Sequence, residues 1–294
     1  MNVKRLHQLL DRFIPGLSDR QIHDSQITSV SGGSINETFK VTIYDDRSFF
    51  LKVNSAKKFP HLFRLEKEGL GNISAVNVIR TPKVLHLDES DDLQILVMEW
   101  IEVGTKTMTF WENFGRQLAE LHHHSNSRFG LSYDNYMGAL SQKNDYHATW
   151  IQFFIQCRLK PQIQLANDSN RLQSLDLDAF EKLFLRLNDI FPNEPASLLH
   201  GDLWSGNFVC DINENAVLID PAVYYGHPSM DLAMTTLFGG FDDTFYKSYN
   251  HHFAFPNNHK EQWEICNLYP LLIHLNLFGS SYLSSIKSVL KRFK

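Results

Sequence analysis

The sequence predicts an α+β protein of two lobes, a small antiparallel sheet with one main helix followed by a larger helical part. Strand and turn patterns alternate through residues 1–100, whereas helical periodicity dominates residues 101–294. A chain of 294 residues is long enough for two packed lobes, because single hydrophobic cores tend to split near this size. We expect these two ranges to be the domains, with a ligand site in the crevice between them.

Composition and charge narrow the range of partners. A hydrophobic content of 43% and 22 phenylalanines indicate a folded globular protein. The formal net charge is −5 and no block of lysine or arginine forms a basic stripe, so we expect no nucleic acid partner. The longest apolar run, residues 93–101, is too short to cross a membrane and contains Glu99. No membrane partner is therefore expected, and the oligomeric state stays open.

The number and spacing of the cysteines indicate the cellular compartment. The chain has 3 cysteines, far apart and without a CxxC pair, which favours a reducing environment over a disulfide framework. The first residues lack the apolar core and small-residue cleavage site of a secretory signal. We therefore expect a cytoplasmic protein.

The N-terminal strands are predicted from the alternation of apolar and polar side chains. Residues 37–53 place apolar side chains at alternate positions of two strands around an aspartate-containing turn, and the second strand ends near Lys52. A helix is predicted over about residues 61–72, and a strand over residues 94–99 after a polar turn. The order of hairpin, helix and further strands predicts a small sheet that carries one helix.

Helical patterns dominate the rest of the chain. Residues 109–121 repeat apolar side chains at helical spacing, and Thr109 followed by Glu112 predicts a capping box at the start of that helix. Residues 207–210 and 216–220 predict a short hairpin embedded among the helices. Further helices are predicted over about residues 148–166, 177–190, 231–239 and 262–292.

The candidate catalytic residues are concentrated in residues 198–222, which read LLHGDLWSGNFVCDINENAVLIDPA. Phosphoryl transfer needs a carboxylate that orients and deprotonates the attacking hydroxyl, and oxygen ligands that hold Mg²⁺. Asp202, Asn207 and Asp220 supply these groups from one short stretch. Each residue alone is better explained by the preference of Asp and Asn for turns, so the prediction depends on their combination.

The N-terminal lobe supplies the other parts that a kinase site requires. Gly32 and Gly33 form a turn between two strands, where the backbone could approach phosphate oxygens, although a full GxGxxG is absent. Lys52 lies on the strand expected to carry a phosphate-binding lysine. Glu66 on the following helix is the expected partner of that lysine, with Glu68 as the rival. Each signal is weak alone, and their order along the chain is what indicates a kinase.

These motifs carry a family resemblance. The chain resembles the fructosamine kinase (ketosamine 3-kinase) family over nearly its whole length, in SGGSINETFKV, FRLEKEGL, LVMEWIE, FGLSYDNYMGALSQKND, WIQFFIQCRL, LLHGDLWSGN, IDPAVYYGHPSMDLAMTTLFGGF and LLIHLNLFGSSYL. The family is a branch of the aminoglycoside-phosphotransferase-like kinases, so the resemblance implies a bilobal protein-kinase-like fold. It also implies ATP-dependent phosphorylation of the 3-hydroxyl of a ketosamine, on a small amine or a protein lysine. The 3-phosphate then eliminates, which leads to deglycation.

The resemblance implies roles for the residues already singled out. Asp202 looks like the proton acceptor, and Asn207 and Asp220 look like the Mg²⁺ ligands. Lys52 resembles the phosphate-binding lysine, held in place by Glu66. ATP and Mg²⁺ are therefore the implied cofactors.

The same resemblance assigns residues around this centre. The main chain of Glu99, Trp100, Ile101 and Glu102 resembles the hinge that bonds the adenine edge of the nucleotide. Ser34 completes the glycine turn, at a position where some family members carry a redox-sensitive cysteine, so we expect no such switch. Asp231 resembles the buried aspartate that braces the catalytic loop, a role compatible with an ordinary helix N-cap.

Two side chains are candidates for contact with the sugar. Trp204, two residues beyond Asp202, could stack on the sugar face or be a core tryptophan. His274 could reach the sugar pocket or be a satisfied core histidine. The consecutive histidines His122–His124 point in different directions around a helix, so we expect a dipole-compensating helix end there and no metal site.

Two alternatives to a ketosamine kinase remain from the sequence. One is a sibling kinase for another small hydroxylated amine, such as an aminoglycoside, choline or homoserine. The other is a nucleotide-binding pseudokinase that serves as a scaffold, against which the presence of a base, metal ligands and lysine argues. The sequence leaves open which ketosugar is preferred, whether the amine is free or protein-bound, and how the protein is regulated.

Overall fold

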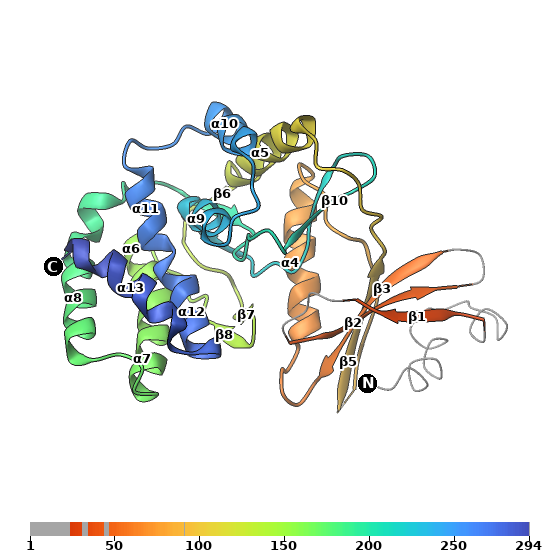
Figure 1. Ribbon diagram of the computed structural model, residues 1–294, viewed down its shortest axis with the longest axis horizontal. Helices are drawn as coiled ribbons and strands as arrows, with labels where there is room; N and C mark the ends of the chain where they lie inside the picture. The colour runs from red at the N-terminus through yellow and green to blue at the C-terminus, as the bar shows by residue number, and fades with distance from the viewer. Residues whose placement is uncertain (1–23, 31–34, 44–46, 91, 294) are drawn as a thin grey trace.

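The N-terminal part of the chain forms an antiparallel sheet and the C-terminal part is mainly helical (Figure 1). The predicted α+β fold with a sheet-rich first part and a helical second part is confirmed. The predicted glycine turn of Gly32, Gly33 and Ser34 lies outside the described residues. The computed structural model describes residues 24–30, 35–43, 47–90 and 92–293.

The N-terminal sheet has the strand order β1-β2-β3-β5-β4, with every neighbouring pair antiparallel. Because side chains alternate along a strand, Leu51 of β3 faces one apolar cluster while Phe50 and Lys52 face the side on which α4 packs. The predicted hairpin and helix are both confirmed. The elements are β1 Gln26–Ser29, β2 Glu37–Thr42, β3 Ser48–Ser55, α4 Leu62–Val76, β4 Val84–Glu89 and β5 Leu93–Glu99.

The C-terminal part combines helices with short strands, and in Figure 1 α4 lies between the sheet and these helices. The predicted hairpin is β10 Phe208–Cys210 with β11 Ala216–Leu218. The remaining strands are β6 Ser125–Asn126, β7 Asn135–Met137, β8 Leu140–Gln142, β9 Ala196–Leu199 and β12 Tyr224–Gly226. The helices are α5 Met108–His122, α6 Trp150–Phe153, η1 Phe154–Leu159 (a π-helix), α7 Lys160–Asp168, α8 Ser174–Ile190, α9 Ser229–Leu237, α10 Asp243–His252, α11 His259–Cys266, α12 Leu268–Phe278, η2 Ser280–Tyr282, α13 Leu283–Leu290 and η3 Lys291–Phe293.

The start of α5 differs from the prediction. Thr107, and not Thr109, is the N-cap, because its side chain accepts the backbone N–H of Phe110 at 3.2 Å. Thr109 lies within the first turn and is exposed. The capping-box prediction was therefore wrong by two positions, since two threonines precede the apolar run and only local backbone geometry decides between them.

The predicted helix over residues 262–292 was wrong in its length. It is divided into α11, α12 and α13, and α12 ends at Gly279, whose φ of 101° is open to glycine but disfavoured for other residues. Helix α10 was not predicted, because its sequence is polar and buries only Phe245, Ser248 and Tyr249. Its packing against α5 makes it helical in the folded chain.

The sheet and the helices share apolar cores. Ile73 of α4 and Ile79 belong to the same buried cluster as Phe114 and Leu118 of α5 and Phe208 of β10. This cluster ties α4 to the segment that carries the candidate catalytic residues. Among the described residues, no helix is long and apolar enough to cross a membrane.

Candidate active site

Asp202 lies in the loop after β9, next to Gly201, whose backbone conformation is constrained. Gly201 has a φ of 84°, and a Cβ there would come within 2.1 Å of the main-chain oxygen of Ala222. Only glycine fits this close approach. Asp231 in the first turn of α9 accepts the backbone N–H of His200 at 2.7 Å and of Gly201 at 2.8 Å. Two hydrogen bonds accepted by one buried carboxylate thus hold the loop, although Asp231 is not the helix N-cap.

His122, in the last turn of α5 as expected, completes this brace. Its side chain is buried, its Nε2 lies 3.2 Å from Asp231 Oδ2, and its Nδ1 lies 2.7 Å from the Tyr249 hydroxyl. Burial alone would raise the pKa of Asp231, but the hydrogen bond and charge of His122 and the N–H of Gly201 hold that pKa below its ordinary value. Asp231 is therefore an ionised, buried anchor.

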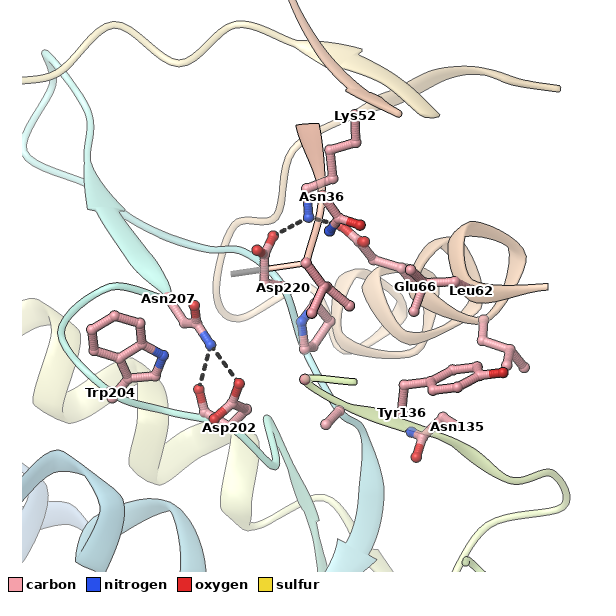
Figure 2. A pocket seen from close by; sticks show the side chains of 15 residues that line it. Asn36, Lys52, Leu62, Glu66, Asn135, Tyr136, Asp202, Trp204, Asn207 and Asp220 are labelled. Atoms are coloured by element: carbon pink, nitrogen blue, oxygen red, sulfur yellow. Dashed lines mark hydrogen bonds and ion pairs between the residues drawn. The ribbon is translucent and has the colours of Figure 1, made fainter. Parts of the chain in front are cut away.

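Asp202 and Asn207 are joined directly. Asn207 Nδ2 donates to Asp202 Oδ2 at 2.9 Å and to the main-chain oxygen of Asp202 at 2.8 Å (Figure 2). Burial, with the charges of Asp220 and Asp231 nearby, raises the pKa of Asp202 to about 7, against the opposing effect of the Asn207 hydrogen bond. A carboxyl that titrates near neutrality is suited to accept a proton.

Lys52 links the two halves of the site. Its Nζ donates to Glu66 Oε1 at 2.6 Å and forms an ion pair with Asp220 (Figure 2). Burial lowers the pKa of Lys52, but the carboxylates of Asp220 and Glu66 outweigh that effect and leave it above its ordinary value. The rival, Glu68, is exposed on α4, so Glu66 is the partner of the lysine.

Asn207 and Asp220 are the candidate ligands for a magnesium ion. Because Asn207 directs its amide nitrogen to Asp202, its Oδ1 points toward Asp220 in Figure 2. Among the described residues there is no group of three His, Cys, Asp or Glu side chains that could hold a metal. Mg²⁺ commonly binds one or two protein ligands together with substrate phosphates, so this pair of oxygen ligands suits it.

Two cavities meet at Lys52 and Asp220. The larger, of about 370 Å³, contains Asp202 and Asn207 between the sheet, α4 and hairpin β7–β8. The smaller, of about 240 Å³, runs to the hinge and is mainly apolar. Its lining residues include Val30, Phe50, Met98, Trp100, Ile101 and Val209. A cavity lined by several charged side chains, joined to an apolar slot, matches the two ends of a nucleotide.

The four residues expected to form the hinge differ in their positions relative to the apolar slot. Glu99, Trp100 and Ile101 line the apolar slot, whereas Glu102 is exposed and lies 3.5 Å from Lys40. The carboxylate of Glu99 is engaged outside the slot, by an ion pair with Arg80 at 3.0 Å. The side chains of Glu99 and Glu102 therefore have other contacts, and the main-chain N–H of Glu99 donates to the main-chain oxygen of Lys83 at 3.0 Å.

The two candidates for sugar contact differ in position. Trp204 lines the larger cavity and its ring lies 6.0 Å from that of Phe238. His274 is not among the residues that line this cavity; its ring lies 5.1 Å from Phe238, and its Nδ1 lies 2.7 Å from the main-chain oxygen of Pro270. Trp204 is thus at the cavity and His274 is one ring further away.

Several residues of the site were given no role in the sequence analysis. Asn36, Asn135 and Tyr136 line the larger cavity. They lie in the stretches SGGSINETFKV and FGLSYDNYMGALSQKND that carry the family resemblance, which was the available signal. His122 had a different signal, since it follows Phe114 and Leu118 at intervals of four and so shares their buried helix face.

The chain is similar to known proteins over most of its length. A model of the fructosamine kinase family matches residues 7–294. The chain is 37% identical over 279 residues to a probable ketoamine kinase of Enterococcus faecium, covering 94% of this chain and 98% of that one. It is 35% identical over 275 residues to the chloroplastic protein-ribulosamine 3-kinase of Arabidopsis thaliana, covering 90% of this chain and 82% of that one.

The chain is also similar to a solved structure over nearly its whole length. The crystal structure of a candidate fructosamine-3-kinase from Thermobifida fusca is similar with a TM-score of 0.87 and 28% identity, and the match covers 99% of each chain. Motifs, fold and overall sequence therefore agree across nearly the whole length. The chain belongs to the fructosamine kinase family.

Proposed function

We propose that the protein is a Mg·ATP-dependent ketosamine 3-kinase, which phosphorylates the 3-hydroxyl of a ketosamine and thereby leads to deglycation of the amine. Family membership and relatives named as ketoamine and ribulosamine kinases support an ATP-dependent phosphotransferase that acts on an alcohol group. The observation that carries the proposal is the presence of Lys52, Asp202 and Asp220 around one cavity. The position of phosphorylation and the later elimination belong to the proposal.

Asp202 is the proposed proton acceptor. The acceptor hydroxyl oxygen forms a bond to the γ-phosphorus of ATP while the bond from that phosphorus to the β–γ bridging oxygen breaks, which releases ADP. The hydroxyl proton passes to the Asp202 carboxylate. A pKa of about 7 makes this carboxylate a stronger base than an ordinary aspartate while it remains ionised in a large fraction of molecules near neutral pH.

The other polar groups are proposed to hold the nucleotide. The Lys52 ammonium, positioned by Glu66, would contact phosphate oxygens. Asn207 Oδ1 and the Asp220 carboxylate would hold Mg²⁺, which when bound neutralises charge on the phosphates. The apolar slot beside Trp100 and Ile101 would take the adenine. We keep the domain ranges 1–100 and 101–294 and the cytoplasmic location as parts of this proposal.

The substrate class is tested by an ADP-release assay on a panel of acceptors. The panel contains fructosamines, ribulosamines and erythrulosamines, together with an aminoglycoside, choline and homoserine. We expect turnover with at least one ketosamine, and phosphate on O3 by NMR. Turnover restricted to the other alcohols would contradict the ketosamine assignment. Nucleotide binding without turnover of any acceptor would indicate a pseudokinase scaffold.

The assigned base is tested by Asp202→Asn. We expect turnover to fall by about 10²- to 10⁴-fold or more, because positioned acid–base catalysis contributes about that much. Thermal stabilisation by Mg·AMP-PNP should persist, since the proposed nucleotide contacts remain. Asp189→Asn, an exposed carboxylate on α8, is the matched control and should keep wild-type turnover. Wild-type activity in Asp202→Asn would falsify the assignment.

A further inference from the structure

Several side-chain amides line the larger cavity, and their hydrogen bonds distinguish them. Asn207 Nδ2 donates twice to Asp202, and Asn135 Nδ2 donates to the main-chain oxygen of Val223 at 2.9 Å. Asn36 also lines this cavity, but its Nδ2 has no acceptor among the described residues. Asn36 is therefore the amide of this group whose nitrogen stays free for a ligand.

The orientation of the Asn36 amide follows from its contact with Asn54 of β3. Asn54 Nδ2 donates to the main-chain oxygen of Ile35 at 3.0 Å, and Asn54 Oδ1 accepts the backbone N–H of Ser55 at 2.7 Å. These two contacts fix which end of the Asn54 amide carries the nitrogen. The same Nδ2 donates to the Asn36 side chain at 2.6 Å, so the Asn36 atom that faces Asn54 is its oxygen. The nitrogen of Asn36 is consequently turned away from Asn54.

The position of Asn36 corresponds to the transferred phosphoryl group. Lys52 and Asp220 line both cavities, whereas Asn36, like Asp202, lines only the larger one. Figure 2 shows Asn36 beside Lys52, with Asp202 further along the cavity. A phosphoryl group that moves from a nucleotide in the apolar slot to a hydroxyl at Asp202 must cross the space between Lys52 and Asp202. Asn36 borders that space from the N-terminal part of the chain.

Few donors in this cavity are free for phosphate oxygens. The charged residues that line it are one ammonium, Lys52, and the carboxylates of Glu66, Asp202 and Asp220. The Lys52 ammonium already donates to Glu66 and Asp220, which engages two of its N–H groups. A neutral amide adds a hydrogen bond to a phosphoryl oxygen without a further charge, and it stays a donor at every pH at which the protein is folded.

We propose that Asn36 is a catalytic residue whose Nδ2 donates a hydrogen bond to a non-bridging oxygen of the transferred phosphoryl group. Asn54 is the positioning residue that orients this amide. The inference rests on the proposed function and adds a donor to it. Asn36 makes and breaks no covalent bond and takes up no proton. It supplies a fixed dipole directed at oxygens that carry the negative charge of the transition state.

The test compares Asn36→Ala with Asn36→Asp, by kcat for an acceptor that the wild type phosphorylates. Asn36→Ala removes the donor, and we expect kcat to fall by about 10²-fold, as when one oxyanion donor is removed. Asn36→Asp keeps an oxygen that accepts from Asn54 but places a carboxylate near the phosphoryl oxygens, so kcat should fall at least about tenfold further. A merely structural role predicts the opposite order, because Asp preserves the shape of the side chain and its contact with Asn54.

Asn188→Ala and Asn188→Asp are the matched controls, because Asn188 is exposed on α8. Both should keep the wild-type kcat, and circular dichroism of every variant provides the folded fraction by which each rate is divided. A wild-type kcat in Asn36→Ala, or a kcat in Asn36→Asp equal to or above that of Asn36→Ala, would overturn the catalytic role.

The positioning role of Asn54 is tested by a double-mutant cycle. Asn54→Ala should lower kcat, and its loss should be less than additive with that of Asn36→Ala, because Asn54 acts through the Asn36 amide. Additive losses would reject the positioning role.

Failure of the proposed function is a separate result. If the acceptor panel shows turnover of another alcohol, the same variants are measured with that alcohol, and the expected order of the Ala and Asp variants is unchanged. A wild type that turns over no acceptor would remove the proposed function together with the role of Asn36. An active wild type and an equally active Asn36→Ala would remove the role of Asn36 alone.

Discussion

Half-buried Asp202 of the catalytic loop and buried Asp231, which holds that loop, have opposite electrostatic environments. At Asp202, burial and the charges of neighbouring carboxylates outweigh one hydrogen bond from Asn207, and the pKa rises to about 7. At Asp231, His122 and the backbone N–H of Gly201 outweigh burial, and the pKa falls. One carboxyl can therefore take up a proton while the other stays ionised and holds the loop.

The raised pKa of Asp202 predicts the pH dependence of activity. A proton acceptor must be ionised, so kcat/KM should fall about tenfold for each pH unit below about pH 7 and level off above it. A pH–rate profile from about pH 5.5 to 8.5, with circular dichroism at each pH as a control for folding, measures this. A flat profile across that range would contradict the role of Asp202.

The same shift predicts a stability effect. The pKa of Asp202 rises from 3.8 in the unfolded chain to about 7 in the folded chain. Between these two pH values the folded chain holds a proton that the unfolded chain has released. The free energy of unfolding therefore decreases as the pH rises from about 4 to about 7. Asp202→Asn removes this penalty and keeps an acceptor for Asn207. We expect its melting temperature at pH 8 to exceed that of the wild type, with a smaller difference at pH 5, by calorimetry. A lower melting temperature at pH 8 would contradict the assigned environment.

At the level of the element, α5 positions the brace. Its buried face includes Phe110, Phe114 and Leu118 and ends with His122, which contacts Asp231. The start of the helix is set by Thr107, whose hydroxyl also donates to Glu214 at 2.7 Å in the turn between β10 and β11. One end of α5 thus contacts the hairpin that follows the catalytic loop, and the other end contacts the aspartate that holds that loop.

The cap assignment predicts different costs for two neighbouring threonines. Thr107→Ala removes the acceptor for the N–H of Phe110 and should cost about 1 kcal/mol of unfolding free energy, or roughly 2 °C in melting temperature. Thr109→Ala is the control and should change the unfolding free energy by less than about 0.5 kcal/mol, because the side chain is exposed. Equal costs in chemical denaturation would reject Thr107 as the cap.

At the level of the whole molecule, the sheet and the helices meet through shared apolar packing as well as through the site. Ile73 of α4 is fully buried in the cluster that contains Phe114, Leu118 and Phe208. Helix α4 also carries Glu66, the partner of Lys52. The position of the ion pair therefore depends on how α4 packs against the helical part.

This shared core predicts the effect of a distant substitution. Ile73→Ala should cost about 2–5 kcal/mol of unfolding free energy, and the chain should still unfold in one calorimetric transition. Ile212→Ala, at a side chain that is 66% exposed, is the control and should lie within about 0.5 kcal/mol of the wild type. Two separate transitions in the Ile73 variant would mean that the two parts fold independently.

The predictions succeeded where they depended on local sequence patterns and failed where they depended on contacts between distant segments. The β2–β3 hairpin, α4 and the β10–β11 hairpin were predictable because alternation and helical periodicity are local patterns. The cap of α5, the break at Gly279 and the polar helix α10 were not, since each depends on packing or on one backbone angle. Asp202, Asn207 and Asp220 lie close together in sequence, so their proximity could be expected.

The sequence alone determined the fold class, the family and the identity of the polar groups, because these depend on patterns and motifs within short segments. Only the tertiary structure decided that Glu66 rather than Glu68 meets Lys52, that His122 is buried against Asp231, and that Asn54 binds the side chain of Asn36 at the larger cavity. Those contacts join residues from separate elements, and their geometry depends on how helices and sheet pack together.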